Sequence, residues 1–176
     1  LPSPGESTAE HILSTYRSDQ RYTHEEAKLL DLCLMLHADH GGGNNSTFAC
    51  RVLSSSGTDT YAALSTAIGS LKGPKHGGAN LKVMKQMDTM MRQINDVYDD
   101  EEVADYLRRV LKKEAGDGSG LIYGMGHAVY TVSDPRAVLL RDKARHLAEV
   151  KGYVEEFHLL CAIERLGPQV YAELKG

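Results

Sequence analysis

Apolar residues recur at three- and four-residue spacing along most of the chain, a pattern that predicts α-helices. Val83, Met84, Met87 and Met91 form one such stripe, and we expect these methionines to fill a core. No segment alternates apolar and polar residues convincingly with the two-residue period of a strand. The sequence therefore predicts an all-α fold.

Start signals divide the helical pattern into separate elements. Ser7 and Thr23 each precede a glutamate by three residues, the arrangement of a capping box, and the second box leads into residues 27–36, which are apolar enough to be largely buried. Pro135 suits a first helical position after Asp134. The remaining helices are expected at 45–53, 58–71, after His76, at 99–113, from Pro135 to about 150, and at 154–166.

Composition limits the class of protein. The 176 residues suffice for one compact domain with a core, and 41% hydrophobic and 25% charged residues are ordinary for a globular protein. The net charge of −4 argues against a nucleic-acid surface. Three cysteines without C-x-x-C spacing are typical of a reduced compartment, so we expect a cytoplasmic protein. Neither a membrane-spanning run nor a signal peptide is expected.

Three glycine-rich segments, at 36–47, 72–80 and 124–136, each contain histidine, the side chain best suited to move protons near neutral pH. Glycine clusters between helices suggest places where the backbone must approach another group closely. Taken singly, each segment also fits a helix cap or a turn. His37, Asp39 and His40 are residue types that bind metal ions, so a metal site is one alternative. No further ligand follows at a specific spacing to complete such a site, and we predict no bound metal.

Together the three segments resemble the citrate synthase family of bacterial type. H-x-D-H-G-G-G-N-N-S-T begins at His37, G-P-x-H-G-G-A-N at Gly73, and G-M-G-H-A-V-Y-T-V-S-D-P-R at Gly124, in the family's order and at similar separations. The resemblance covers essentially the whole chain. It implies a multihelical fold in which residues 1–36 are large-domain helices, 37–150 the small catalytic domain, and 151–176 helices returning toward the large domain.

The resemblance implies an acyltransferase that condenses acetyl-CoA with oxaloacetate, with no permanently bound cofactor. Asp134 would take a proton from the acetyl methyl group, His37 would stabilise the enolate, and His76 would polarise the ketone of oxaloacetate. His127 and His40 are expected on the substrate side, His40 chiefly as a local structural partner.

The turn before His76 is expected to meet the adenine end of CoA, largely through its backbone. Its residues are Leu71, Lys72, Gly73, Pro74 and Lys75. The expected partners are acetyl-CoA and oxaloacetate, with no nucleic acid and no membrane. The resemblance also implies a homodimer for the full-length protein.

Family members are considerably longer, so the resemblance implies that this chain is a fragment. It would lack the arginines that bind the substrate carboxylates, and we expect little or no activity from it alone. A 2-methylcitrate synthase that uses propionyl-CoA stays open, because one methylene changes binding by only ~1–3 kcal/mol. A non-catalytic CoA-binding helical module and a metal hydrolase built on His37, Asp39 and His40 are further alternatives.

Overall fold

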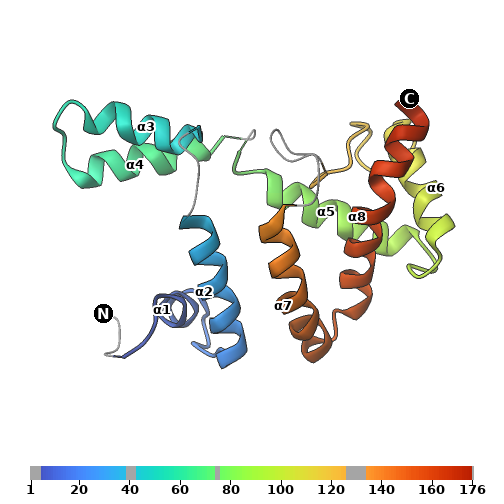
Figure 1. Cartoon of the computed structure of the whole chain (residues 1–176), viewed down its shortest axis with the longest axis horizontal. Helices are drawn as coiled ribbons and strands as arrows, with labels where there is room; N and C mark the ends of the chain where they lie inside the picture. The colour runs from blue at the N-terminus through green and yellow to red at the C-terminus, as the bar shows by residue number, and fades with distance from the viewer. Residues whose placement is uncertain (1–4, 39–42, 74–75, 126–133, 176) are drawn as a thin grey trace. The chain divides into compact units, whose positions relative to one another are not determined.

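A computed structural model describes residues 5–38, 43–73, 76–125 and 134–175 (Figure 1). The described residues form only α-helices and connecting segments, so the all-α prediction is confirmed. The helices are α1 (Thr8–Tyr16), α2 (His24–Ala38), α3 (Asn45–Ser54), α4 (Thr60–Leu71), α5 (Ala79–Gln93), α6 (Asp100–Leu111), α7 (Pro135–Lys151) and α8 (Val154–Lys175). Among these residues no helix is both long and apolar enough to cross a bilayer.

The chain packs as two compact units. Unit 1 comprises residues 1–41 and 129–153 and holds α1, α2 and α7, whereas unit 2 comprises residues 42–128 and 154–176 and holds the other helices. The chain therefore enters each unit twice. The domain boundaries expected at residues 36 and 150 rest on the family resemblance and stay a prediction.

Both predicted capping boxes are present in unit 1. The Glu10 amide donates to Ser7 Oγ at 3.2 Å, while the Ser7 amide donates to the Glu10 carboxylate at 2.7 Å. Thr23 and Glu26 exchange the same pair of hydrogen bonds, at 3.2 and 2.7 Å. The two boxes satisfy amides that have no partner in the first helical turn, so α1 and α2 begin where the sequence predicts.

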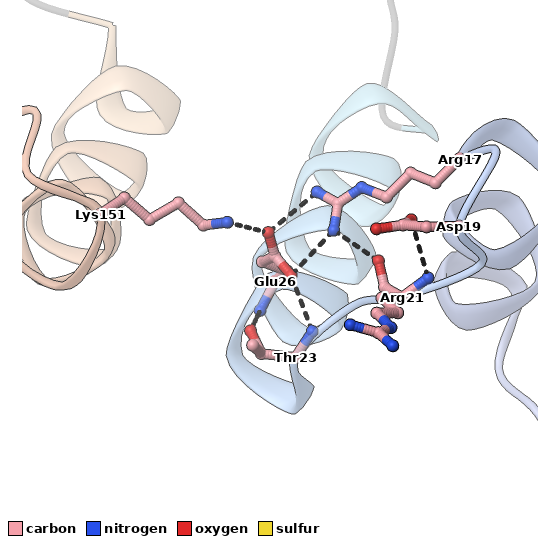
Figure 2. A network of polar contacts seen from close by, with 6 residues as sticks. All are labelled: Arg17, Asp19, Arg21, Thr23, Glu26 and Lys151. Carbon is pink, nitrogen blue, oxygen red and sulfur yellow. Dashed lines mark hydrogen bonds and ion pairs between the residues drawn. The ribbon is translucent and has the colours of Figure 1, made fainter.

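The carboxylate of Glu26 joins all three helices of unit 1 (Figure 2). Glu26 is only 6% exposed, yet it carries a charge. Arg17, which follows α1, donates through both terminal nitrogens to the two oxygens of the Glu26 carboxylate, at 3.0 and 2.8 Å. Lys151 of α7 forms an ion pair with Oε1 of the same carboxylate. These partners, Arg17 first, hold the pKa of the Glu26 carboxyl far below its usual range.

The expectation that residues 27–36 are largely buried is wrong within unit 1. Of these residues, Ala27 is buried, whereas Leu34 and Met35 are exposed. Three helices have too little surface to enclose an apolar helix on more than one side. The apolar composition of α2 therefore predicted its helical state but not its burial.

In unit 2, α3 packs against α4. Ala63 and Ala67 of α4 are buried, as their size predicts. Helix α4 begins at Thr60 rather than Thr58, because the Asp59 carboxylate accepts a hydrogen bond from the Ala62 amide at 3.0 Å and thereby acts as the N-cap.

The apolar core of unit 2 is formed by α5, α6 and α8. Its largest fully buried side chains are Met90, Leu107, Leu159, Val103, Val110 and Val170. Met87 and Met91 pack against this core as expected, but Met84 is exposed, because only the second half of α5 contributes to the cluster. The prediction for Met84 is therefore wrong.

Charged residues of α6 do more than solvate its outer face. Arg165 of α8 pairs with both oxygens of Asp100 at 2.7 and 2.6 Å, and Arg108 Nε donates to Glu173 at 3.1 Å. These pairs are partly exposed, so each contributes at most about 1 kcal/mol. They set the register of two helices whose attraction comes from the apolar core.

Helix α8 continues to Lys175, well beyond residue 166, where the sequence predicts its end. Pro168 lies inside the helix, although proline removes one backbone hydrogen bond. Leu166 and Val170, on either side of it, are both buried, and the burial of these side chains offsets that loss. The core of unit 2 therefore overrides the local break.

Replacing Glu26 with glutamine should reduce stability in a pH-dependent way. The free energy of unfolding should fall by about 3 kcal/mol at pH 7, since both cations lose their counter-charge. The folded carboxyl has a lowered pKa, so its contribution is present above the ordinary glutamate value of 4.5 and is lost as the pH falls below it. Urea unfolding at a series of pH values measures the difference.

Glu25→Gln is the matched control, because Glu25 is the neighbouring carboxylate, is exposed, and pairs with Lys28 only at 3.6 Å. It should change the free energy of unfolding by less than about 0.5 kcal/mol. Equal effects of the two substitutions, or a Glu26→Gln effect that does not shrink toward pH 3, would contradict the role given to the Glu26 network.

Candidate functional site

The described part of the chain contains six of the residues that the sequence singles out. They are His37, Leu71, Lys72, Gly73, His76 and Asp134. His40, Pro74, Lys75 and His127 lie outside the described residues. The expected roles of all ten stay predictions, and the geometry of the six shows what each can do.

His37 lies in the last turn of α2 and is exposed. Its Nδ1 is 2.6 Å from the carbonyl oxygen of Cys33. A carbonyl can only accept, so Nδ1 carries a proton in this arrangement. The other ring nitrogen, Nε2, then accepts a hydrogen bond when the ring is neutral and donates one only when the ring is protonated.

Asp134 is the N-cap of α7, followed by Pro135 at the first helical position, as the sequence predicts. Its carboxylate accepts a hydrogen bond from the Arg136 amide at 2.9 Å. The Arg136 guanidinium also pairs with it, Nε with Oδ1 at 3.0 Å and Nη2 with Oδ2 at 2.6 Å. These contacts favour the carboxylate anion, which is the form that a base requires.

The pairing with Arg136 was not foreseen from the sequence. The sequence indicated only that Asp134 precedes a helix whose first position is Pro135. An arginine two positions after an N-cap can fold back over the cap, which is the one signal that could have indicated it. The Asp134 side chain is 20% exposed, so solvent reaches part of this pair.

His76 lies in a turn held together by one carbonyl group. The amides of His76 and Gly77 both donate to the carbonyl oxygen of Gly73, at 3.1 and 3.0 Å. Helix α5 begins only at Ala79, with Gly78 as an N-cap that makes no side-chain hydrogen bond. The helix expected after His76 is therefore confirmed, and it begins three residues further along the chain.

This turn is packed closely against the end of α4, where the candidate CoA contacts Leu71 and Lys72 lie. A Cβ atom added to Gly77 would be 2.6 Å from the carbonyl oxygen of Leu71, a backbone atom that cannot rotate away. Only glycine fits there, which is the close approach that the second glycine-rich segment predicts. The turn that carries His76 is thus coupled to the end of α4.

The end of the first glycine-rich segment is joined to the end of α4 in unit 2. Asn44 caps α3, accepting a hydrogen bond from the Ser46 amide at 2.9 Å, as predicted. Asn45 Nδ2 donates to the carbonyl oxygen of Ser70 at 3.1 Å and so joins the start of α3 to the end of α4. The sequence indicated the cap but contained no sign of this second contact.

Gln86 of α5 holds the segment that leads to the third glycine-rich region. Its Nε2 donates to the carbonyl oxygen of Leu121 at 3.0 Å, and its Oε1 accepts from the Tyr123 amide at 2.8 Å. A carboxamide whose nitrogen and oxygen both hydrogen-bond to the backbone of one segment holds that segment as a short bridge. No sequence signal distinguished Gln86 from an ordinary surface residue.

The loop at residues 116–120 is held by polar groups of its own and by Tyr123. Tyr123 donates its hydroxyl proton to Asp117 at 2.7 Å, and the Ser119 amide donates to the same carboxylate at 3.0 Å. Hydrogen bonds from Ser119 and Tyr123 lower the pKa of Asp117 to about 2.

A metal site has no support among the described residues, where no group of three or more His, Cys, Asp or Glu side chains is arranged to hold an ion. Two of the three candidate ligands, Asp39 and His40, lie outside those residues.

His37 and Asp134 belong to unit 1, and His76 belongs to unit 2. Within unit 1, α2 packs against α7, and Lys151 at the end of α7 pairs with Glu26 near the start of α2. The two helices therefore run antiparallel. The end of α2 and the start of α7 consequently lie toward the same end of the helix pair (Figure 1). His37 lies in the last turn of α2 and Asp134 directly before α7, so both belong to that end.

Comparison with known proteins covers the whole chain. The family model described as "Citrate synthase, C-terminal domain" matches residues 1–176. The citrate synthase of Deinococcus radiodurans is 42% identical over 144 residues, which are 82% of this chain and 35% of that protein. The citrate synthase of Synechocystis sp. is 40% identical over 150 residues, 85% of this chain and 34% of that protein.

A 2-methylcitrate synthase from Shewanella oneidensis is 35% identical over 139 residues, covering 79% of this chain and 34% of that protein. The chain thus spans about a third of the length of the curated relatives it matches.

Gly77→Ala should destabilise the turn that carries His76. The added methyl group would meet the Leu71 carbonyl, and the forced backbone shift should lower the free energy of unfolding by about 1–3 kcal/mol. Gly69→Ala is the matched control, because Gly69 lies inside α4 with open space around it and alanine there should be neutral or stabilising by up to about 1 kcal/mol. Urea unfolding compares the variants, and a Gly77→Ala chain as stable as Gly69→Ala would refute the close approach.

Proposed function

The chain belongs to the citrate synthase family, and on that premise we propose that the full-length protein condenses acetyl-CoA with oxaloacetate to give citrate and free CoA. The observation that carries this proposal is the family match over the entire chain, together with identities of 42% and 40% to two citrate synthases. The local geometry of Asp134, His37 and His76 is compatible with it.

The first chemical step is removal of a proton from the methyl carbon of acetyl-CoA by the Asp134 carboxylate. The electron pair left on carbon forms an enolate, which attacks the ketone carbon of oxaloacetate to give citryl-CoA. Water then cleaves the thioester and releases citrate and CoA. The contacts from Arg136 support this assignment, because they hold the Asp134 carboxylate in one direction.

Two histidines supply donors where negative charge develops. His76 would donate to the ketone oxygen of oxaloacetate. His37 would stabilise the enolate, and its contact with Cys33 sets a condition on that role, because Nε2 can donate only from the protonated ring while Nδ1 stays bound to the carbonyl. Rotation of the ring away from Cys33 would free Nδ1 as the alternative donor.

CoA would bind along the turn that follows α4. The residues proposed for it are Leu71, Lys72, Gly73, Pro74 and Lys75. The tight packing of Gly77 on Leu71 supports a backbone-defined surface there. A ligand that is recognised by hydrogen bonds to backbone groups needs such a fixed turn.

We propose further that the full-length protein is a cytoplasmic homodimer. The hairpin of α3 and α4 exposes large apolar side chains, among them Phe48, Tyr61 and Ile68. Apolar side chains gathered on one hairpin support a subunit contact there.

A 2-methylcitrate synthase is the second candidate, favoured by the relative of that name in Shewanella oneidensis. The two activities differ in one methylene of the acyl group, which is worth only ~1–3 kcal/mol in a pocket. Comparing kcat/KM for acetyl-CoA and propionyl-CoA on the full-length protein decides between them. A higher value for propionyl-CoA would replace the first proposal with the second.

Asp134→Asn should abolish most of the condensation activity of the full-length protein. Asparagine caps a helix as well as aspartate does, so the start of α7 should be preserved, whereas its amide cannot accept the methyl proton. We expect kcat to fall by about 10²–10⁴-fold, the usual contribution of a general base. Release of the CoA thiol from acetyl-CoA in the presence of oxaloacetate measures it.

Asp59→Asn is the control for this substitution, because Asp59 is the N-cap of α4 and makes the same kind of hydrogen bond. It should leave kcat within about 2-fold, since a neutral cap replaces a charged one without loss of the hydrogen bond. CoA binding by the wild-type protein without any thiol release would favour a non-catalytic module instead.

A polypeptide of residues 1–176 alone is expected to show little or no turnover.

A further inference from the structure

We infer that the Glu26–Lys151 ion pair is a positioning device for the reaction, because it sets α7 against α2 and thereby the placement of Asp134 relative to His37. This inference rests on the proposed function, in which those two residues act on the same acetyl group. Glu26 and Lys151 would act through the helices and touch no substrate.

The ion pair and the reacting groups lie at opposite ends of one helix pair. Glu26 is the third residue of α2 and Lys151 the last residue of α7. His37 follows Glu26 by about 17 Å along α2, and Asp134 precedes Lys151 by about 26 Å along α7, at 1.5 Å per residue. A helix is stiff along its axis, so displacement of α7 at Lys151 carries Asp134 with it.

Apolar packing does little to prevent such displacement. Helix α7 has no buried residue among those described, and α2 has only two, Glu26 and Ala27. Contacts between partly exposed apolar side chains are non-directional and allow two helices to slide. A charged pair within hydrogen-bonding distance is directional, and here it involves one of the two buried residues of α2.

The acceptor that Lys151 meets is itself fixed. Two hydrogen bonds from Arg17 and one from the Thr23 amide orient the Glu26 carboxylate. The position also lies in the first turn of α2, where the positive end of the helix dipole favours an anion. Lys151 therefore binds to a preset oxygen rather than to a mobile surface carboxylate (Figure 2).

The end of α7 is fixed as well. Gly152, directly after Lys151, adopts a left-handed conformation with φ of 76°, and the Tyr153 amide donates to the Ala148 carbonyl at 2.9 Å. This cap ends the helix at Lys151 and satisfies its last carbonyl groups. A cation in the last turn also suits the negative end of the dipole. The backbone position of Lys151 is consequently fixed at the end of α7.

The test is kinetic and uses Lys151→Met in the full-length protein. Methionine keeps the length and the apolar stem of lysine but removes the charge. We expect kcat to fall by about 10–100-fold, the cost of roughly 1 Å of misplacement, with KM for both substrates within about 2-fold. The deuterium isotope effect on kcat with trideuterated acetyl-CoA should rise, because proton removal becomes slower relative to later steps.

Two matched variants separate positioning from stability. Lys151→Arg preserves the cation and should return kcat and the isotope effect close to the wild-type values. Ser7→Ala removes the capping box of α1, which lies in the same unit but outside the Glu26 network, and should lower Tm while leaving both kinetic values unchanged. A loss of kcat in Ser7→Ala equal to that in Lys151→Met, or an unchanged isotope effect in Lys151→Met, would overturn the inference.

A direct measurement of the helix pair distinguishes this inference from the proposed function. Spin labels replace Met35 on α2 and Leu139 on α7, both exposed, in a protein whose own cysteines are changed to serine. The distance distribution between the labels should shift or broaden in Lys151→Met but not in Lys151→Arg. An unchanged distribution would overturn the inference, whereas a shifted one in a protein that cannot condense the substrates would overturn the proposed function alone.

Discussion

The buried carboxylate of Glu26 is the interaction on which the arrangement of unit 1 depends. A lone charge in that position would cost several kcal/mol, and here Arg17, Lys151 and the Thr23 amide compensate it from three directions. Apolar burial offers no substitute, because the only other buried side chains described in this unit are the alanines Ala9 and Ala27. The three helices are therefore held by a polar network where a larger domain would use a core.

Unit 2 is built on the opposite principle. Met90, Leu107 and Leu159 anchor an apolar core that joins α5, α6 and α8, and polar contacts fix its details. The second half of α5 lies in that core, so the helix is fixed along its length. It therefore supports two neighbouring segments: residues 121–123, which Gln86 bridges, and the turn carrying His76, which leads into the start of α5. The rigid part of the unit thus positions segments that have little burial of their own.

Two of the three candidate catalytic groups, Asp134 and His37, have a partner that limits their chemistry. Arg136 pairs with both oxygens of Asp134 and so fixes the direction of its carboxylate. Cys33 holds one nitrogen of His37, so the proton on the other decides whether His37 can donate. The proposed enolisation therefore depends on contacts one step away from the reacting atoms, and the family membership of the chain gives these contacts their chemical meaning.

The sequence by itself determined the local features of this protein. Helix starts at Ser7, Thr23, Asn44 and Asp134, the all-α class and the family resemblance all follow from spacings of a few residues, where side chains and backbone interact directly. Only the tertiary structure decided the features that depend on contacts between segments far apart in the sequence. These features are the exposure of Met35 and Met84, the continuation of α8 past Pro168, and the bridges made by Gln86 and Asn45. The sequence marked Glu26 as half of a capping box, but the arrival of Lys151 from 125 positions away made it the centre of unit 1. Local hydrogen bonding sets where a helix begins, whereas the packing of distant helices sets which side chains are buried and which charges meet.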